Sequence, residues 1–256
     1  MRGCLAIANA AAFIGVDPQE LWDRYLAKDD EAKNLRQSHG KVPVLSLGFG
    51  GGLGALLKMA INYGVYFTEE QGRAMVEGWR ANNPWAREFW GSFRTDRYTG
   101  EVIQATGLWG AANMALRNPG EAFPAGRVAY AFDPDYLGGT LFCALPCGRL
   151  LTYPHCKYRT KTVKNKDTGE EEDVFALWFK KGYGWSSLWY GKLAENVTQA
   201  TAGSILRETL QALDGEFTDF EEVIDFWQAV GGDPAKHGPV GHTHDEGVLE
   251  VPTALA

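Results

Sequence analysis

A glycine-rich stretch divides this sequence more sharply than any other feature. Five of the seven residues from Gly48 to Gly54 are glycine. Glycine loses more conformational freedom on folding than any other residue, so a regular element is not expected to continue through such a run. The segment from Arg36 to Phe49 therefore ends here, and a helical pattern follows from Leu56 to Asn62. Two structures fit the segment before the glycines, and they imply different functions.

In the first interpretation, Val42 to Phe49 is a buried strand. Gly50, Gly52 and Ala55 then match the G-x-G-x-x-A pattern of a dinucleotide-binding turn, in which the backbone approaches a pyrophosphate closely. The chain would be a dinucleotide-dependent oxidoreductase. So many glycines match several spacings by chance, however, and the basic residues of the segment precede the strand instead of following it.

In the second interpretation, a helix runs from about Ala32 to Leu47. Arg36, Gln37 and Lys41 then lie about one turn apart on one side. Cationic side chains in that arrangement can bind a triphosphate, and the ring of Phe49, one or two turns further along, can stack on a base. A glycine and a proline inside the segment both disfavour a helix, so both interpretations stay open.

The net charge of −7 is unevenly distributed along the chain. Residues 214–250 hold ten acids and one base, a local charge of −9, which leaves +2 for the rest of the sequence. Between residues 149 and 166 there are six bases and no acid. Such a basic arm is either a solvated hairpin or a contact for nucleic-acid phosphates. The candidates for that contact are Arg149, Lys157, Arg159, Lys161 and Lys164.

Capping signals predict where the helices begin. The expected N-terminal caps are Asp17, Thr68, Asn83 and Thr218. A long helix is expected from Lys192 to Leu213, with strands on either side of the turn at residues 146–148 and from Val174 to Lys180. Because strands are expected to enter only after about residue 125, we predict an α+β fold with a mostly helical region at 1–125 and a second region at 126–256.

The cysteine content and the hydropathy pattern indicate the compartment. Four cysteines are too few for a disulfide framework in 256 residues, and they fit a reducing environment. No apolar run approaches the ~20 residues that a membrane helix needs, so we expect a soluble, cytosolic protein. A zinc site is a further alternative for one group of side chains, but its spacing matches no common zinc module and small buried residues are favoured instead. That group is Cys143, Cys147, His155 and Cys156.

Two further segments carry candidate functional residues. In His244-Asp245-Glu246, two adjacent carboxylates suit a hard cation such as Mg²⁺, although a polar turn, or a zinc site that includes His242, also fits. Glu195 and Gln199 lie four residues apart on one helix face beside small residues. A glutamine there can read base edges or bind a neighbouring helix.

Together these segments resemble the family A DNA polymerases, in the phage-type branch. The matching segments, in chain order, are Gly40–Gly52 (like motif B of the fingers helix), Leu145–Arg149, Tyr190–Ala200 and His244–Glu246 (like motif C). The resemblance runs from about residue 7 to residue 252. It implies a helical fingers region and a partial palm of antiparallel strands with a long helix. It also implies a DNA-directed DNA polymerase of a phage-infected or prophage-bearing bacterium, acting in the cytoplasm on a primer-template and dNTPs.

The resemblance also implies roles for residues that bind the incoming nucleotide. Lys41 would hold its phosphates and act as general acid for the pyrophosphate. Arg36 would contact the outer phosphates, although the arginine of the family stands four residues before the lysine, where this chain has Gln37. Phe49 stands where the family usually has tyrosine and would stack near the templating base.

Other matched residues would bind DNA and metal. Gln199 would probe the minor groove near the primer end, and His244 would lie near the primer terminus. Asp245 would bind both catalytic Mg²⁺ ions, with Glu246 close by, in a two-metal phosphoryl transfer.

One part of the family pattern is not recognised in this sequence. Motif A, which carries the second metal-binding aspartate, finds no match, and neither do the thumb and the exonuclease region. Hard cations prefer several oxygen ligands, so we expect Mg²⁺ to bind well only when an upstream polymerase chain supplies motif A. The alternative is a truncated product that serves as a catalytically inactive DNA-binding or assembly module.

Overall fold

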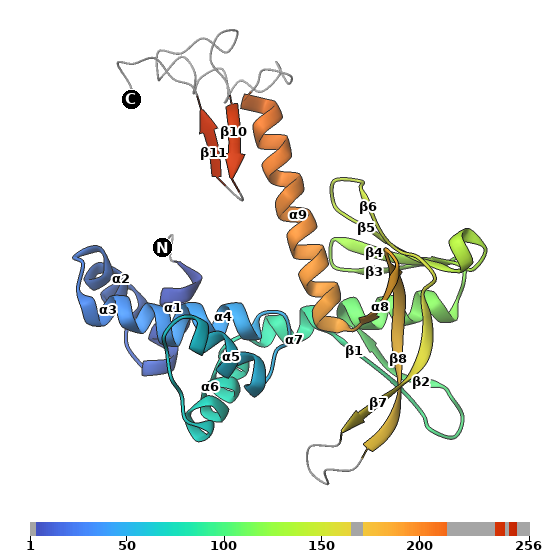
Figure 1. Ribbon diagram of the computed structural model, residues 1–256, viewed down its shortest axis with the longest axis horizontal. Helices are drawn as coiled ribbons and strands as arrows, with labels where there is room; N and C mark the ends of the chain where they lie inside the picture. The colour runs from blue at the N-terminus through green and yellow to red at the C-terminus, as the bar shows by residue number, and fades with distance from the viewer. Residues whose placement is uncertain (1–3, 165–170, 214–238, 244–245, 250–256) are drawn as a thin grey trace. The chain divides into compact units, whose positions relative to one another are not determined.

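The computed structural model describes residues 4–164, 171–213, 239–243 and 246–249. Helices and antiparallel sheets make up this part of the chain, which agrees with the predicted α+β class (Figure 1). Contacts divide the chain into two compact units. The first is Met1–Ala144 with Leu150–Glu195, and the second is Leu145–Arg149 with Asn196–Ala256. The two predicted regions that meet at residue 125 stay a prediction.

Helices dominate the first half of the described chain. The α-helices are α1 (Leu5–Ile14), α2 (Pro18–Leu26), α3 (Asp30–Leu35), α4 (Val42–Leu47), α5 (Leu53–Asn62), α6 (Glu69–Asn82), α7 (Pro84–Trp90), α8 (Gly107–Arg117) and α9 (Tyr190–Leu213). A π-helical turn, η1 (Arg36–Lys41), joins α3 to α4, and a short 3₁₀ helix, η2 (Tyr136–Gly138), precedes β5. Within the described residues, we find no helix with the length and apolar character needed to span a membrane.

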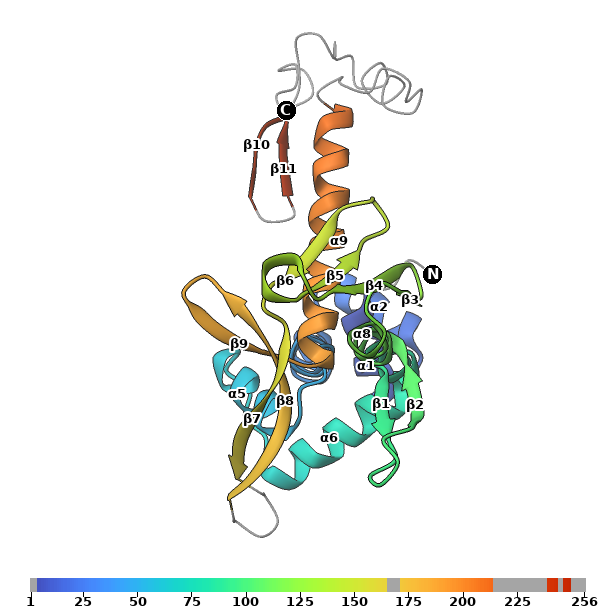
Figure 2. The ribbon, with the colours of Figure 1, turned by 90° about the vertical axis from the view of Figure 1, so that its right-hand side faces the viewer.

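Within the part of the chain that the structure describes, the strands form four antiparallel groups. They are β1 (Ser92–Thr95), β2 (Val102–Thr106), β3 (Ala122–Ala125), β4 (Val128–Asp133), β5 (Thr140–Ala144), β6 (Leu150–Tyr153), β7 (Lys157–Lys164), β8 (Glu171–Lys181), β9 (Gly184–Leu188), β10 (Pro239–Thr243) and β11 (Glu246–Leu249). β3, β4, β5 and β6 make one sheet in that order, β7, β8 and β9 make another, and β1–β2 and β10–β11 are separate hairpins. In the first unit, α8 packs against β3 and β4 (Figure 2).

The predicted helix starts are confirmed wherever the structure describes them. The Asp17 carboxylate accepts hydrogen bonds from the first backbone N–H groups of α2, with Pro18 in the first turn. Thr68 and Gln71 form a complete capping box at the start of α6. α7 begins at Pro84, directly after Asn83, as predicted, but the Asn83 side chain makes no capping hydrogen bond and binds Asn9 and the Trp79 carbonyl instead. The fourth predicted cap, Thr218, lies outside the described residues.

Strands enter earlier than the sequence predicts. The hairpin β1–β2 lies between Ser92 and Thr106, ahead of the expected boundary at residue 125. The Asp96 carboxylate accepts hydrogen bonds from the backbone N–H groups of Tyr98 and Thr99, and this local bonding forms the turn. The hairpin was not predicted because β2 is exposed along its length and shows no alternating apolar pattern.

The segment before the glycine run is helical, so the strand interpretation of Val42 to Phe49 is wrong. α3, η1 and α4 follow one another without a break from Asp30 to Leu47. In η1 the backbone hydrogen bonds span five residues, and the Val42 N–H donates to the Gln37 carbonyl. The G-x-G-x-x-A match therefore lacks the strand that a dinucleotide-binding turn requires. Without that strand, the oxidoreductase hypothesis has no structural basis.

A proline and a glycine within this helix are accommodated by the π-helical turn. Pro43 is the second residue after η1, so the change in hydrogen-bond register lies close to the residue that lacks an N–H. Gly40 is buried, and a Cβ atom at this position would overlap the backbone carbonyl of Ala6 in α1. The absence of a side chain thus lets α1 and η1 pack backbone against backbone.

We predict that Gly40→Ala destabilises the fold. The added methyl would meet backbone atoms that cannot move aside easily, and overpacking of this kind costs about 1–3 kcal/mol. Urea unfolding followed by circular dichroism measures the change. Gly54→Ala in α5 is the matched control, because no atom lies within 4 Å of a Cβ at Gly54 and alanine favours a helix. Equal midpoints for the two variants would contradict the packing role of Gly40.

Candidate nucleotide and nucleic-acid site

The π-helical turn places Gln37 and Lys41 together at Tyr63, the residue that follows α5. The Lys41 ammonium lies 5.0 Å from the centre of the Tyr63 ring, and the Gln37 amide donates to the Tyr63 carbonyl at 3.2 Å. Both side chains are half-buried. A cation over a ring face is attracted by the ring quadrupole yet keeps its full charge. Lys41 is therefore oriented by the fold, and no carboxylate among the described residues pairs with it.

Arg36 does not share this position. Its guanidinium lies 5.0 Å from the Tyr25 ring centre in α2, and one of its nitrogens is 3.8 Å from the Cys4 sulfur. The Arg36 Nε is buried and has no hydrogen-bond partner among the described residues. The cationic face predicted for the helix therefore divides in two, with Gln37 and Lys41 on the Tyr63 side and Arg36 on the side of α1 and α2.

The glycine run forms a loop against the start of α9. A Cβ atom at Gly191 would overlap the Phe49 carbonyl, and one at Gly50 would meet the Tyr190 ring. Gly50 also has φ 77°, a left-handed conformation that favours glycine. Two of the segments that resemble the polymerase family, Gly40–Gly52 and the start of Tyr190–Ala200, thus meet in the first unit, where Gly50 and Gly191 allow close packing.

Side chains from α6 and α7 fix this loop. The Trp90 indole N–H donates to the Gly48 carbonyl at 3.0 Å, and an Arg80 guanidinium N–H donates to the Gly51 carbonyl at 3.2 Å. Trp90 lies between two other rings, with centroids 6.2 Å from Trp79 and 5.9 Å from Tyr190. A sequence pattern could not reveal these residues, because an apolar stripe with arginines is typical of any helix that covers a core.

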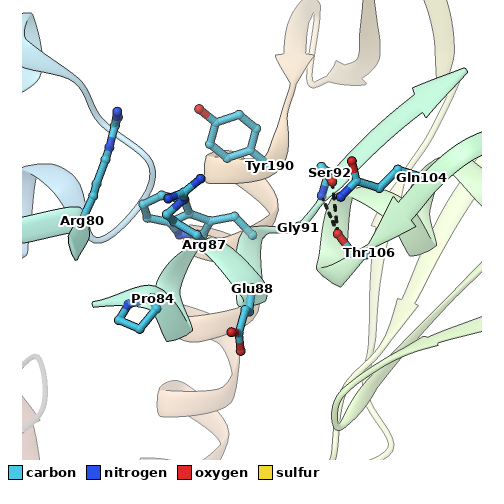
Figure 3. Close-up of a pocket in the computed structure, with 10 residues that line it drawn as sticks. Arg80, Pro84, Arg87, Glu88, Gly91, Ser92, Gln104, Thr106 and Tyr190 are labelled. Carbon is cyan, nitrogen blue, oxygen red and sulfur yellow. Dashed lines mark hydrogen bonds between the residues drawn. The ribbon is translucent and has the colours of Figure 1, made fainter. Parts of the chain in front are cut away.

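A pocket of about 780 Å³ lies beside this loop in the first unit (Figure 3). Hydrogen bonds between Ser92 and Thr106 join β1 to β2 at one wall. The lining combines two guanidinium groups, one carboxylate, two aromatic rings and several hydroxyl or amide groups, a set that can bind a phosphate and stack on a base. The lining residues are Arg80, Pro84, Arg87, Glu88, Trp90, Gly91, Ser92, Gln104, Thr106 and Tyr190.

The predicted basic arm is a strand, β7, paired with β8. Because successive side chains of a strand point to opposite faces, Lys157 and Arg159, two residues apart, occupy one face. Lys157 and Arg159 are exposed, and the side chains of Lys161 and Lys164 are outside what the structure describes. The strand thus presents its described cations on a single face of the β7–β8–β9 sheet.

In the second unit, the turn before β6 contacts α9. The Arg149 guanidinium and the Cys147 thiol both donate to the Ser204 hydroxyl, at 3.1 and 3.3 Å. The Ser204 hydroxyl in turn donates to the Ala200 carbonyl at 2.9 Å. Arg149 is thus engaged with α9, and Gln199 is exposed on the same helix.

The predicted metal ligands lie at the limit of the described chain. His244 and Asp245 fall outside the described residues, and Glu246 is described only through its backbone pairing with Thr243 in the β10–β11 hairpin. Among the side chains that the structure describes, no three histidine, cysteine or acidic residues gather in a way that could hold a metal ion. The magnesium site therefore stays a prediction. The four cysteines are free thiols.

Comparison with known proteins points to DNA polymerases. The chain is similar to part of a phage enzyme of that class. This enzyme is the DNA polymerase of Bacillus phage SP02, which is 32% identical over 220 residues, or 85% of this chain. The match covers 27% of the phage polymerase, so this chain spans about a quarter of its length. No family model matches the chain, and no solved structure matches it.

We predict that Cys147 is the thiol that reacts fastest with a thiol reagent. Its hydrogen bond with Ser204, backbone hydrogen bonding and the nearby Arg149 charge lower its pKa, and the residue is exposed. Burial raises the pKa of Cys143 to about 11 and that of Cys156 to about 12. Because the thiolate is the reactive form, the fast phase of labelling with a disulfide reagent at pH 7–8 should vanish in Cys147→Ser.

Cys4 is the test of this assignment, because its pKa is also lowered although the side chain is half-buried. Cys4→Ser should keep the fast phase of labelling. Ser204→Ala should slow it, since the pKa of Cys147 then rises toward its ordinary value. A fast phase that survives in Cys147→Ser and is lost in Cys4→Ser would overturn the prediction.

Proposed function

We propose that this chain is part of a DNA-directed DNA polymerase of the family A type and takes part in template-directed nucleotidyl transfer. The similarity to part of a phage DNA polymerase supports this proposal. The observation that carries it within the structure is the continuous helix from Asp30 to Leu47, which orients Lys41 and leads directly into the loop at Phe49. A helix of this kind is what the resemblance to motif B implies.

Lys41 is the proposed phosphate-binding residue. Its ammonium is held over the Tyr63 ring, and none of the ion pairs among the described residues includes it. Triphosphate oxygens would supply the counter-charge that the protein does not. In this role Lys41 would bind the nucleotide and donate a proton to the leaving pyrophosphate. Gln37 would assist from the same side, whereas Arg36 would have to leave the Tyr25 ring to reach a phosphate.

Phe49 is the proposed stacking residue near the templating base. Its carbonyl abuts Gly191, and it lies within the glycine loop, between the carbonyls of Gly48 and Gly51 that Trp90 and Arg80 bind. This packing fixes the backbone on both sides of Phe49. A ring on such a support can stack on a base without losing much side-chain freedom.

We propose that Mg²⁺ supplies the remaining chemistry, through Asp245 and Glu246 with His244 at the primer terminus. Two carboxylates suit a hard cation, but a two-metal site needs further oxygen ligands. Those ligands would come from a motif A aspartate on a polypeptide segment outside this sequence. Gln199 and the basic strand β7 would contact the primer-template, together with Arg149.

A second candidate function follows from the same incomplete set of acids. Without motif A the chain would bind DNA or assemble with a polymerase and perform no catalysis. Asp245→Asn separates the two functions. If the chain is catalytic when combined with a segment that carries motif A, this variant should lose primer extension by more than about a hundred-fold while its affinity for a primer-template changes less than three-fold. If the wild-type combination shows no primer extension with Mg²⁺, the chain is a binding module.

We predict that Lys41→Ala weakens dNTP binding, and primer extension in combination with a segment that carries motif A, by about a hundred-fold or more, because a preorganised charge on the phosphates is removed. Lys58→Ala is the matched control, since Lys58 is exposed in the neighbouring helix α5. Nucleotide binding is measured by tryptophan fluorescence with dTTP and Mg²⁺, and extension with a labelled primer. Equal losses in both variants would assign Lys41 a structural or nonspecific role.

A further inference from the structure

The β7–β8–β9 sheet has two chemically different faces. On one face, Leu177, Phe179 and Leu188 are buried, and the Tyr158 hydroxyl donates to the Asn113 side chain in α8. Loss of hydration raises the pKa of Tyr158 to about 12. This face contacts the rest of the first unit, through Tyr158 against α8 and Phe179 against the Tyr153 ring in β6.

The other face carries cations and tryptophans. The strand register places Lys157 opposite Trp178, and Lys180 opposite Trp185. The Trp185 ring is 38% exposed, and Lys157, Arg159 and Lys180 are exposed as well. We call this set the cation–tryptophan face. Its described members are Lys157, Arg159, Ala176, Trp178, Lys180, Trp185 and Ser187.

Ring contacts order the side chains of this face. The Arg159 guanidinium lies 4.5 Å from the Trp185 ring centre and 5.9 Å from that of Trp178. The Lys157 ammonium lies 5.2 Å from the centre of the Trp185 ring. The centroids of the His155 and Trp185 rings are 6.5 Å apart. No ion pair among the described residues includes these cations. The face therefore offers oriented positive charge together with one exposed ring, Trp185, and one half-buried ring, Trp178.

We infer that the cation–tryptophan face binds single-stranded DNA by stacking unpaired bases on Trp185 and Arg159. Bases stack on indole rings and on guanidinium planes, and a single strand is the form of DNA in which base faces are free. Lys157 and Lys180 would contact the phosphates. The inference rests on the proposed polymerase function for the kind of nucleic acid, because an unpaired template strand accompanies template-directed synthesis.

Charge and chemistry favour this occupant over a purely electrostatic partner. Three cations and no acid occur among the described side chains of the face, although Glu172 takes a backbone position on it near the far end of β8. An anionic surface would pair with the lysines alone and would leave the tryptophans without a function. A base with its phosphate uses both.

The test is the affinity of the full chain for a fluorescein-labelled 20-mer of dT, measured by anisotropy. Trp185→Ala should weaken binding about ten-fold or more, in line with the loss of base stacking. Trp185→Phe keeps an aromatic face and should bind within about three-fold of the wild type. Phe175→Ala is the matched control, because Phe175 is 81% exposed on the opposite face of the same strand pair and its removal should change nothing.

An abasic 20-mer separates stacking from charge. It keeps the phosphates but has no bases, so it should bind more weakly than dT and should not respond to Trp185→Ala. Equal binding of the two oligomers, or tighter binding of a duplex, would show an electrostatic surface and overturn the inference. Tighter binding of an RNA 20-mer would overturn the assignment to DNA.

Salt dependence tests the lysines independently of the tryptophan. The double variant Lys157→Gln with Lys180→Gln should reduce the slope of log affinity against log salt by about 1.4, or about 0.7 for each phosphate that a lysine no longer neutralises. An unchanged slope would remove the lysines from the site. Because oligomer binding needs no synthesis, a chain that binds dT as expected but never extends a primer would contradict only the proposed polymerase function.

Discussion

The register shift in the backbone hydrogen bonds at Arg36–Lys41 is the constraint on which the candidate nucleotide site depends. It lets one helical path continue through a buried glycine and a proline, which would otherwise weaken or break it. The same turn allows α1 to pack against Gly40 and directs Gln37 and Lys41 toward Tyr63. Within α4, the Ser46 hydroxyl donates to the carbonyls of Val42 and Pro43, one turn earlier.

The glycine loop connects this helix to the start of α9, which is distant in the sequence. Its backbone carbonyls accept from Trp90 and Arg80, and its glycines admit Tyr190 and the Gly191 backbone at the start of α9. Tyr190 also lines the pocket beside the loop. A change at Tyr190 would thus affect both the loop and the pocket, although more than a hundred residues separate Tyr190 from the loop in the chain. This shared residue is a physical reason for the two matching segments to occur together.

Local signals were predictable from sequence, and tertiary ones were not. The caps at Asp17 and Thr68 were predicted because their hydrogen bonds join residues two or three apart. The sequence left the helix and strand interpretations of residues 42–49 equal, since a proline argues against the helix unless the π-helical turn is known. The departure of Arg36 toward Tyr25 depends on where α2 packs, and no spacing rule contains that information. Likewise, the two chemically different faces of the β7–β8–β9 sheet could be assigned only once the pairing register of β7 and β8 was known.

Four of the cations that the sequence assigns to phosphate binding are held by aromatic rings, whereas Arg149 is held by the Ser204 hydroxyl. Arg36, Lys41, Lys157 and Arg159 each lie over an aromatic ring, whereas the ion pairs found among the described residues are made by Arg24, Lys33, Arg73 and Lys192. A carboxylate partner neutralises a cation and competes with phosphate for it. A ring orients the cation for about 0.5–1 kcal/mol at an exposed site and leaves the charge to the ligand. Such oriented, unneutralised charge is what a site needs to bind an anionic substrate without first breaking an ion pair.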